Sequence, residues 1–213
     1  MLDLKKIFLE DYARYVVLDT EACNLNLVSR QNLPWQISWI ECKGKFVEKE
    51  ENHYLWWENL HLSPGAAFVT HFNYEYYKSK AVDPKVIAEK FKAVLEDKNT
   101  YIVWQNGLRY DDFTIRNWFE ACGVKHSYDY LERSIDTSCL SKAMKEEIKF
   151  PRDGDLLEWQ FKLANHIRKG LKTSVGVMCK ELDISIDETK QHDALYDIEM
   201  TKEIFIKLIY KLS

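Results

Sequence analysis

Two acidic residues follow a short apolar run of the chain, in the sequence Val-Val-Leu-Asp-Thr-Glu. Residues 15–18 are apolar and rich in β-branched side chains, which favours a buried strand. Side chains two apart in a strand point to the same side, so Asp19 and Glu21 converge while Thr20 faces the other way. Two carboxylates held together away from water repel each other, a cost that a divalent cation removes. The spacing predicts a metal site, although a strand that runs into a charged, solvated turn is the alternative.

A third carboxylate follows another apolar run, residues 101–104, in Asn-Gly-Leu-Arg-Tyr-Asp-Asp-Phe. Asn106-Gly107 marks the exit of a strand into a turn, and helical spacing begins at Asp111. Asp111 shares a helical stripe with three apolar side chains, Ile115, Trp118 and Phe119. It is therefore expected to face inward as a metal ligand, with simple capping of the helix as the alternative. Asp112 leans toward Arg116 and is expected to be a charge at the helix N-terminus with no further role.

The last element is Gln-His-Asp-Ala-Leu-Tyr-Asp at residues 191–197, which leads into a terminal helix. Five residues at about 100° each would put His192 and Asp197 roughly 140° apart if both were helical. We therefore expect His192 in the loop or first turn before the helix and Asp197 on its packed face. This arrangement suits one proton acceptor and one rigid metal ligand, with a surface histidine near a helix start as the alternative.

Taken in order, the three elements resemble the DnaQ-like, or DEDDh, 3'-to-5' exonuclease superfamily, whose members have a ribonuclease H-like fold. The resemblance covers roughly residues 14–210 and leaves 150–172 unaligned. Its motifs are all present: D-x-E as Asp19 and Glu21, N-G-x-x-Y-D as Asn106 through Asp111, and H-x(4)-D as His192 and Asp197. The tyrosine branch of the superfamily would need a tyrosine where Asp193 stands, so the histidine branch fits.

The resemblance implies a catalytic site made of these four carboxylates and the histidine. Oxygen ligands favour Mg²⁺, or Mn²⁺, over zinc, because hard cations prefer hard oxygens. As a hypothesis, Asp19 bridges two ions, Glu21 and Asp197 hold the ion that orients the attacking water, and Asp111 supports the other ion. His192 then accepts the proton of that water.

Substrate contacts are expected, by resemblance, from five residues: Thr20, Ala22, His71, Phe72 and Asn106. An aromatic side chain stacked on an unpaired base contributes about 1–3 kcal/mol without demanding a sequence. Aromatic residues make up 14% of the chain, so packing is the alternative for Phe72 and is favoured for Tyr74, Tyr76 and Tyr77. The Trp56-Trp57 pair is expected to pack on an edge strand.

The activity implied is hydrolysis of phosphodiester bonds at the 3' end of single-stranded DNA, with release of nucleoside 5'-monophosphates. The form of the second motif favours DNA, and a 3'-5' exoribonuclease that trims RNA ends or short oligonucleotides is the alternative. An inactive exonuclease-fold module that binds nucleic acid or a polymerase belongs to another class, and so does an integrase-type enzyme. An inactive module would lack one or more of the four metal-ligating carboxylates, all of which are present here. An integrase-type enzyme would not require the motif of His192 and Asp197.

The composition of the chain is compatible with this function. A length of 213 residues, 46% of them hydrophobic, predicts one exonuclease domain over 1–213. The net charge of −4 is unusual for a protein that binds nucleic acid, but the four carboxylates account for it and two divalent ions would offset it. Five cysteines without a CxxC motif predict free thiols in a reducing compartment. Acidic residues interrupt the apolar N-terminal segment, so we expect a cytoplasmic protein without a signal peptide or membrane span.

The pattern of the chain predicts an α/β fold with a mixed five-stranded sheet flanked by helices, as in ribonuclease H. Proline after Asp83 marks the start of the first expected helix. Strands are expected at 14–19, 33–42, 45–57, 101–105 and 132–136. Helices are expected at 84–96, 111–121, 137–147, 173–182 and in the terminal segment.

Overall fold

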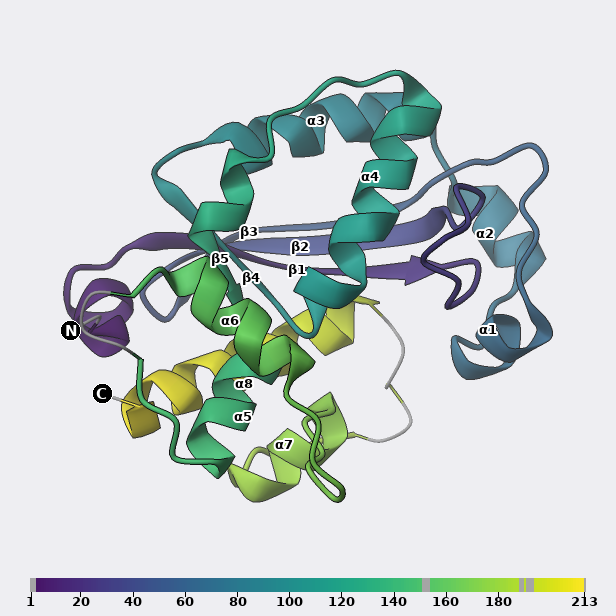
Figure 1. The fold of residues 1–213 in the computed structure, drawn as a ribbon. Helices are drawn as coiled ribbons and strands as arrows, with labels where there is room; N and C mark the ends of the chain where they lie inside the picture. The colour runs from purple at the N-terminus through teal and green to yellow at the C-terminus, as the bar shows by residue number, and fades with distance from the viewer. Residues whose placement is uncertain (1–2, 151–153, 188–189, 191–193, 213) are drawn as a thin grey trace.

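Five strands form one mixed sheet in the computed structural model, which describes residues 3–150, 154–187, 190 and 194–212 (Figure 1). In chain order they are β1 (Arg14–Ala22), β2 (Pro34–Lys43), β3 (Phe46–Tyr54), β4 (Thr100–Trp104) and β5 (Ser134–Asp136). Their order across the sheet is β3-β2-β1-β4-β5. Strand β2 is antiparallel to β1 and β3, whereas β4 is parallel to β1 and β5. The predicted fold class, a mixed five-stranded sheet flanked by helices, is confirmed.

Helices cover both faces of this sheet. They are α1 (Pro64–Val69), α2 (Tyr74–Lys80), α3 (Pro84–Glu96), α4 (Asp111–Cys122), α5 (Thr137–Lys145), α6 (Leu156–Asn165), α7 (Val175–Glu181) and α8 (Ala194–Leu212). Short non-α turns are η1 (Lys6–Glu10), η2 (Gly107–Arg109) and η3 (Asp129–Arg133). Helices α3 and α4 lie on one face, α5 to α8 lie on the other, and α1 and α2 lie beyond the end of β1 (Figure 1).

Three helices were not predicted from the sequence. Helices α1 and α2 precede the expected first helix at Pro84, and α6 occupies a segment that looked irregular. Their first turns are closed by side chains, since Ser63, Asn73 and Asp155 each accept a hydrogen bond from a backbone N–H three residues on. Helices of 6 and 7 residues are too short to show a clear apolar period. Strand β3 also ends earlier than expected, at Tyr54.

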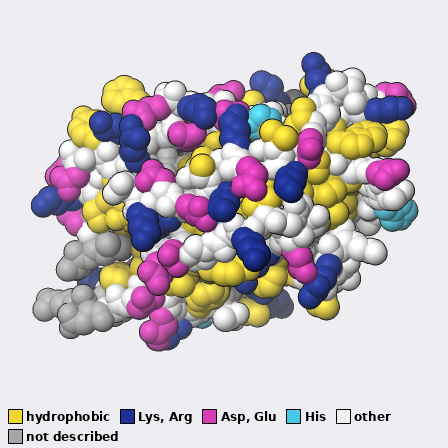
Figure 2. Space-filling model, turned by 90° about the horizontal axis from the view of Figure 1, so that it is seen from above, with side chains coloured by type: hydrophobic (Ala, Val, Ile, Leu, Met, Phe, Trp, Pro, Cys, Tyr) yellow, Lys and Arg dark blue, Asp and Glu magenta, His cyan; other side chains and the backbone are white. Residues whose placement is uncertain are grey.

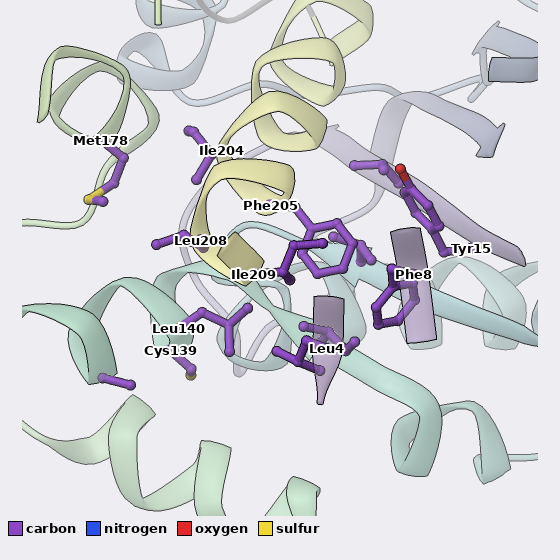
Figure 3. Close-up of a cluster of buried hydrophobic side chains, with 14 of the residues drawn as sticks. Leu4, Phe8, Tyr15, Cys139, Leu140, Met178, Ile204, Phe205, Leu208 and Ile209 are labelled. Carbon is purple, nitrogen blue, oxygen red and sulfur yellow. The ribbon is translucent and has the colours of Figure 1, made fainter. Parts of the chain in front are cut away.

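The side chains of β1 alternate between two buried clusters. Tyr15 and Val17 belong to the cluster built with η1, α5 and α8 (Figure 3). The ring of Tyr15 lies edge-on to Phe8 and Phe205, with centroids 5.6 and 5.4 Å away. Buried aromatic pairs in this geometry contribute about 0.5–1.5 kcal/mol beyond their area. This packing anchors the start of β1 and the second half of α8.

The other face of β1 packs against α3 and α4. Val16 and Leu18 are at most 1% exposed in that second cluster. Because helices cover both faces, the run before Asp19 is apolar at every position, as expected of a central strand. The alternation places Asp19 and Glu21 on the α8 side of the sheet.

The surface over α3 and α4 carries charges of both signs. Lysine and arginine side chains are interspersed there with aspartate and glutamate (Figure 2). That face therefore presents no continuous basic track for a nucleic-acid backbone. No helix among the described residues is long and apolar enough to cross a lipid bilayer.

Candidate functional site

Three carboxylates meet at the end of β1. Asp19, Glu21 and Asp197 each offer an oxygen atom, and these oxygens lie within 4.8 Å of one another. Asp19 and Glu21 share a side of β1, whereas Asp197 comes from the first turn of α8. Helix α8 packs across β1, β2 and β4, and this packing brings Asp197 to the strand end. Asp19 and Glu21 lie together as the strand spacing predicts, and Asp197 joins them from α8.

Asp111 approaches the same strand from the opposite face. It opens α4 and is 2% exposed. Its Oδ1 accepts two hydrogen bonds from Thr20, from the backbone N–H at 3.0 Å and from the hydroxyl at 2.7 Å. The hydroxyl of Thr114, one turn further along α4, lies 2.9 Å from that of Thr20. Thr20 thus faces away from Asp19 and Glu21 and fixes the fourth carboxylate to the residue between them.

The turn before Asp111 is well suited to its Asn-Gly sequence. Asn106 has a φ of 61°, in the left-handed region that asparagine tolerates. A Cβ atom at Gly107 would collide with the ring of Trp104, so no other residue fits there. This tight exit from β4 turns the chain into η2 and directs α4 toward the end of β1.

A buried aspartate that the sequence analysis missed holds this turn. Asp136 is 1% exposed and accepts hydrogen bonds from the backbone N–H groups of Asn106 at 2.9 Å, Leu108 at 3.2 Å and Ser138 at 2.9 Å. Gln160 of α6 accepts from the N–H of Asp136 at 2.7 Å and donates to Ser134 O at 2.9 Å. Gln160 therefore occupies the free edge of β5. The sequence analysis expected only the end of a strand at 136 and the start of a helix at 137. It gave no sign that the Asp136 carboxylate also binds the turn after β4 besides capping α5.

The carboxylates destabilise each other in their ionised forms. Burial raises the pKa of Asp19 well above its usual range, and the neighbouring charges of Asp111, Glu21 and Asp197 raise it further. Burial also raises the pKa of Asp111 to about 7, although the hydrogen bonds from Thr20 oppose this shift. Burial raises the pKa of Asp136 to about 6. A divalent cation at the cluster would supply the missing positive charge, and the all-oxygen donor set fits Mg²⁺ or Mn²⁺.

An aromatic cleft of about 510 Å³ lies beside the carboxylates. It contains both His71 and Phe72, which were predicted to contact substrate. The cleft also contains Gln36, which pairs with Glu21 across the β1–β2 ladder. The other aromatic side chains that line it are Trp35, Tyr54, Tyr76, Tyr77 and Tyr196. The size falls within the roughly 300–1,000 Å³ that is usual for small-molecule sites.

Some aromatic residues near this cleft are packed in the protein, whereas others are exposed to solvent. Tyr77 is buried, and its hydroxyl donates to Leu55 O at 2.6 Å, as the packing alternative predicted. Tyr76 remains 54% exposed. Trp56 and Trp57 lie beyond β3 and are not part of an edge strand: Trp56 stacks on Tyr77, and Trp57 Nε1 donates to Pro34 O. The predicted packing of this pair is present, but its predicted place on an edge strand was wrong because β3 ends at Tyr54.

The remaining predicted substrate residues have different surroundings. Thr20 and Ala22 are 4% and 5% exposed, and the Thr20 hydroxyl is engaged with α4. Asn106 is exposed and lines a second, polar hollow that also contains Asp197. His192 lies outside the described residues. Roles in substrate binding and proton transfer remain predictions for all of these residues.

Asp112 has more contacts than the helix charge without a further role that we expected. It is 3% exposed, accepts a hydrogen bond from the Tyr130 hydroxyl at 2.5 Å and pairs with Arg116 at 2.5 Å. The predicted pairing with Arg116 is present, but η3 covers it, and sequence spacing gives no indication of this distant contact. Asp112 therefore attaches α4 to η3 and stands apart from the candidate metal site.

Comparison with known proteins identifies the family to which the chain belongs. Residues 16–205 match the sequence model of the RNase T family, which is described as exonuclease. The chain therefore belongs to this exonuclease family, within the DnaQ-like superfamily that its motifs resemble. No curated protein sequence matches the chain significantly.

Solved structures similar to this chain include complexes of exonuclease I from E. coli. The complex with a dT13 oligonucleotide has 18% identity and a TM-score of 0.70, and the match covers 94% of this chain and 41% of that one. The complex with a dA16 oligonucleotide has 18% identity and a TM-score of 0.69, with 92% and 40% covered. At this identity the similarity concerns the fold. The chain spans about two fifths of the length of these relatives.

Proposed function

We propose that the protein is a metal-dependent 3'-5' exonuclease that removes nucleoside 5'-monophosphates from the 3' end of single-stranded DNA. The observation that carries the proposal is the convergence of Asp19, Glu21 and Asp197 within 4.8 Å in a chain of the exonuclease family. The similar fold of exonuclease I, solved with single-stranded oligonucleotides, supports this class of substrate.

The cation would be held by these three carboxylates, with Asp111 beside them. Bound Mg²⁺ or Mn²⁺ would supply charge neutralisation at the phosphate and a more acidic water, and the family resemblance implies two ions. Asp111 would keep a fixed orientation because one of its oxygens is held by Thr20. That leaves Oδ2 to face the site, either directly or through water. The roles that we assign to Glu21 and Asp197, as ligands near the attacking water, remain part of the proposal.

The reaction balances as a simple hydrolysis. The oxygen of a water molecule attacks the terminal phosphodiester phosphorus, and the bond from phosphorus to the 3' oxygen of the preceding nucleotide breaks. The proton of the water passes to a base, which we assign to His192 from its place in the last motif. The leaving 3' oxygen takes up a proton and becomes the new 3' hydroxyl. The products are a nucleoside 5'-monophosphate and a strand one nucleotide shorter.

The aromatic cleft would receive the base of the terminal nucleotide. Phe72 lies edge-on to Trp35 with ring centroids 5.0 Å apart, so its orientation is fixed by packing. His71 has a φ of 50°, which directs it out of the regular helix path at the end of α1. Stacking on aromatic faces is tolerant of sequence, in keeping with an exonuclease that removes successive nucleotides.

The direct test uses single-stranded DNA and RNA of the same sequence, each labelled at the 5' end. Incubation with Mg²⁺ should shorten the DNA stepwise from its 3' end, and EDTA should stop the reaction. The Asp19→Asn variant serves as the control against contaminating nucleases. Shortening of RNA alone would correct the substrate, and no shortening of either strand would refute the proposed activity.

A further inference from the structure

A hollow rich in lysine lies at the C-terminal end of α8, far from the carboxylates. This end of α8 lies near η1, at the opposite end of the sheet from α1 and α2 (Figure 1). Because a helix rises about 1.5 Å per residue, Tyr210 is about 20 Å from Asp197 along α8. The lysine hollow has a volume of about 510 Å³, and its lining residues are Lys45, Glu203, Ile206, Lys207, Tyr210 and Lys211.

The lysine hollow carries a local excess of positive charge in a chain whose net charge is −4. Lys45, Lys207 and Lys211 are exposed, and none of them forms an ion pair within the described part of the chain. The acidic residue of the wall, Glu203, has a partner of its own in Lys202, at 3.2 Å. Lysines near a helix C-terminus offset its dipole, which accounts for the two on α8. Lys45 comes from the β2–β3 turn, so the helix dipole does not explain its position.

An exposed aromatic ring stands among these charges. Tyr210 is 46% exposed. The Nζ atoms of Lys5 and Lys45, which belong to two other segments, lie 5.5 and 5.3 Å from the centroid of its ring. An aromatic ring beside ammonium groups offers a face to an unpaired base and positive charge to a phosphate. Proteins that bind single-stranded nucleic acid without sequence preference combine these two kinds of group.

The lysine hollow opens on the same side of α8 as the aromatic cleft. Residues three and four apart lie on one face of a helix, and such a stripe runs from the cleft to the hollow through Tyr196, Glu199, Glu203, Lys207 and Tyr210. A strand whose 3' end occupies the cleft can therefore reach the hollow along one side of α8. Because two glutamates lie between the cleft and the hollow, phosphate contacts are expected at the ends of this path and not along it.

We propose that the lysine hollow is a second, remote contact for the single-stranded substrate, in which Lys45, Lys207 and Tyr210 bind a part of the strand several nucleotides 5' to the cleaved bond. The inference rests on the proposed exonuclease activity. A nucleic-acid strand fits the hollow better than an acidic polypeptide does, because it supplies bases for the exposed ring as well as negative charge for the lysines. Strands that are long enough to reach the hollow therefore bind more tightly than short ones.

The test compares a long oligo(dT), of about 20 nucleotides, with the trinucleotide, which is too short to reach the hollow. The double variant Lys45→Glu/Lys207→Glu should raise the KM for the long strand about tenfold and leave kcat/KM for the trinucleotide unchanged. The Kd of the fluorescein-labelled long strand is measured with Ca²⁺ in place of Mg²⁺. The slope of log Kd against log salt should fall by about 1.4 in the double variant, for two lost phosphate contacts. Tyr210→Ala should raise this Kd about fivefold, whereas Tyr210→Phe retains the ring and should remain close to wild type.

A matched control lies with α3 and α4, which cover the other face of the sheet (Figure 1). The double variant Lys85→Glu/Lys125→Glu makes the same charge change at exposed positions and should leave the KM for both substrates unchanged.

Two kinds of result would overturn the inference. The first is an equal loss of the double variant Lys45→Glu/Lys207→Glu on both substrates, or no change in its Kd for the long strand. The second is displacement of the labelled strand from the wild-type protein by polyglutamate as readily as by unlabelled oligo(dT), because the hollow would then belong to an acidic polypeptide. Wild-type protein that hydrolyses neither substrate would instead contradict the proposed function, and the Kd comparison would still test the hollow.

Discussion

The hydroxyl and the backbone N–H of Thr20 both donate to one oxygen of Asp111, at 2.7 and 3.0 Å. Thr20 stands between two carboxylates of the metal-site candidate, so the strand that carries Asp19 and Glu21 also orients the fourth acid. The side of β1 that faces away from the site thereby determines where Asp111 lies. In metal sites, such partners of the ligands contribute strongly to activity.

Replacing Thr20 by valine should weaken activity without unfolding the protein. Thr20→Val keeps the shape of the side chain and the backbone bond but removes the hydroxyl that stabilises ionised Asp111. We expect kcat to fall by about tenfold to a hundredfold. The acidic limb of the pH–rate profile should also move to higher pH, because the pKa of Asp111 rises further. Thr20→Ser retains the hydroxyl and should remain close to wild type; equal losses in both variants would assign the effect to packing.

Asp19→Asn should remove activity and stabilise the protein without metal. Loss of a ligand at the centre of the cluster should lower kcat by about 10⁴-fold. The substitution also removes a buried carboxyl whose ionised form is destabilised by burial and by repulsion from Asp111, Glu21 and Asp197. Each kcal/mol gained raises Tm by about 2–4 °C in a chain of this size. Calorimetry in EDTA should therefore show a higher Tm for Asp19→Asn, and added Mg²⁺ should raise its Tm less than that of wild type. A lower Tm in EDTA would contradict the repulsion.

The raised pKa of Asp111 predicts a specific dependence of stability on pH. With a pKa of about 7 in the folded protein and an ordinary value of 3.8, the folded state holds a proton that the unfolded state has lost between these pH values. The contribution of Asp111 to the free energy of unfolding therefore falls as pH rises from about 4 to about 7 in the absence of metal. Burial lowers the pKa of His53 and His126 below their ordinary value of 6.5. The contribution of these two histidines to the free energy of unfolding therefore rises with pH below 6.5.

The measurement is the free energy of unfolding in urea of wild type and Asp111→Asn, in EDTA at pH 5 and pH 8. The histidine contributions that both proteins share cancel when one value is subtracted from the other. Asp111→Asn should gain stability relative to wild type as pH rises. A difference independent of pH would show that Asp111 is already ionised at pH 5 in the folded protein.

Asp136→Ala should be strongly destabilising. Three backbone N–H groups, of Asn106, Leu108 and Ser138, would lose their acceptor inside the protein. At about 1–3 kcal/mol for each buried unsatisfied group, the free energy of unfolding should fall by at least about 3 kcal/mol. Asp136→Asn keeps one acceptor oxygen, so its free energy of unfolding should fall by less than that of Asp136→Ala. Urea unfolding measures both, and a loss below about 1 kcal/mol for the alanine variant would mean that water replaces the carboxylate.

The strands and the longer helices were predictable because their patterns are local. The apolar run before Asp19, the Asn-Gly turn and the Asp-Pro start of α3 all appear at the predicted places. Their physical signals are a continuous apolar run, a residue in the left-handed conformation, and an aspartate cap followed by proline. Each of these acts within a few neighbouring residues. The inward stripe that begins at Asp111 is also present, since all three apolar members are fully buried.

The features that sequence could not predict depend on contacts between distant segments. Asp112 is buried because η3 brings Tyr130 over it. Asp136 binds both the turn that follows β4 and the first turn of α5. Gln160 closes the edge of β5 from α6, in the segment that the family resemblance left unaligned. A single polar residue in a helix gives no indication of such a partner. The polar hollow beside Asp197 likewise exists only because the α6–α7 segment folds against α5.

The central claim is that Asp19, Glu21 and Asp197 together bind a catalytic divalent cation. Crystals soaked in Mn²⁺ and measured at the manganese absorption edge test this most directly. We predict anomalous density among the oxygens of these three residues, within about 2.0–2.3 Å of at least two of them, and its loss in Asp19→Asn. Ordered crystals that show these carboxylates pointing apart, or manganese bound only elsewhere, would contradict the account.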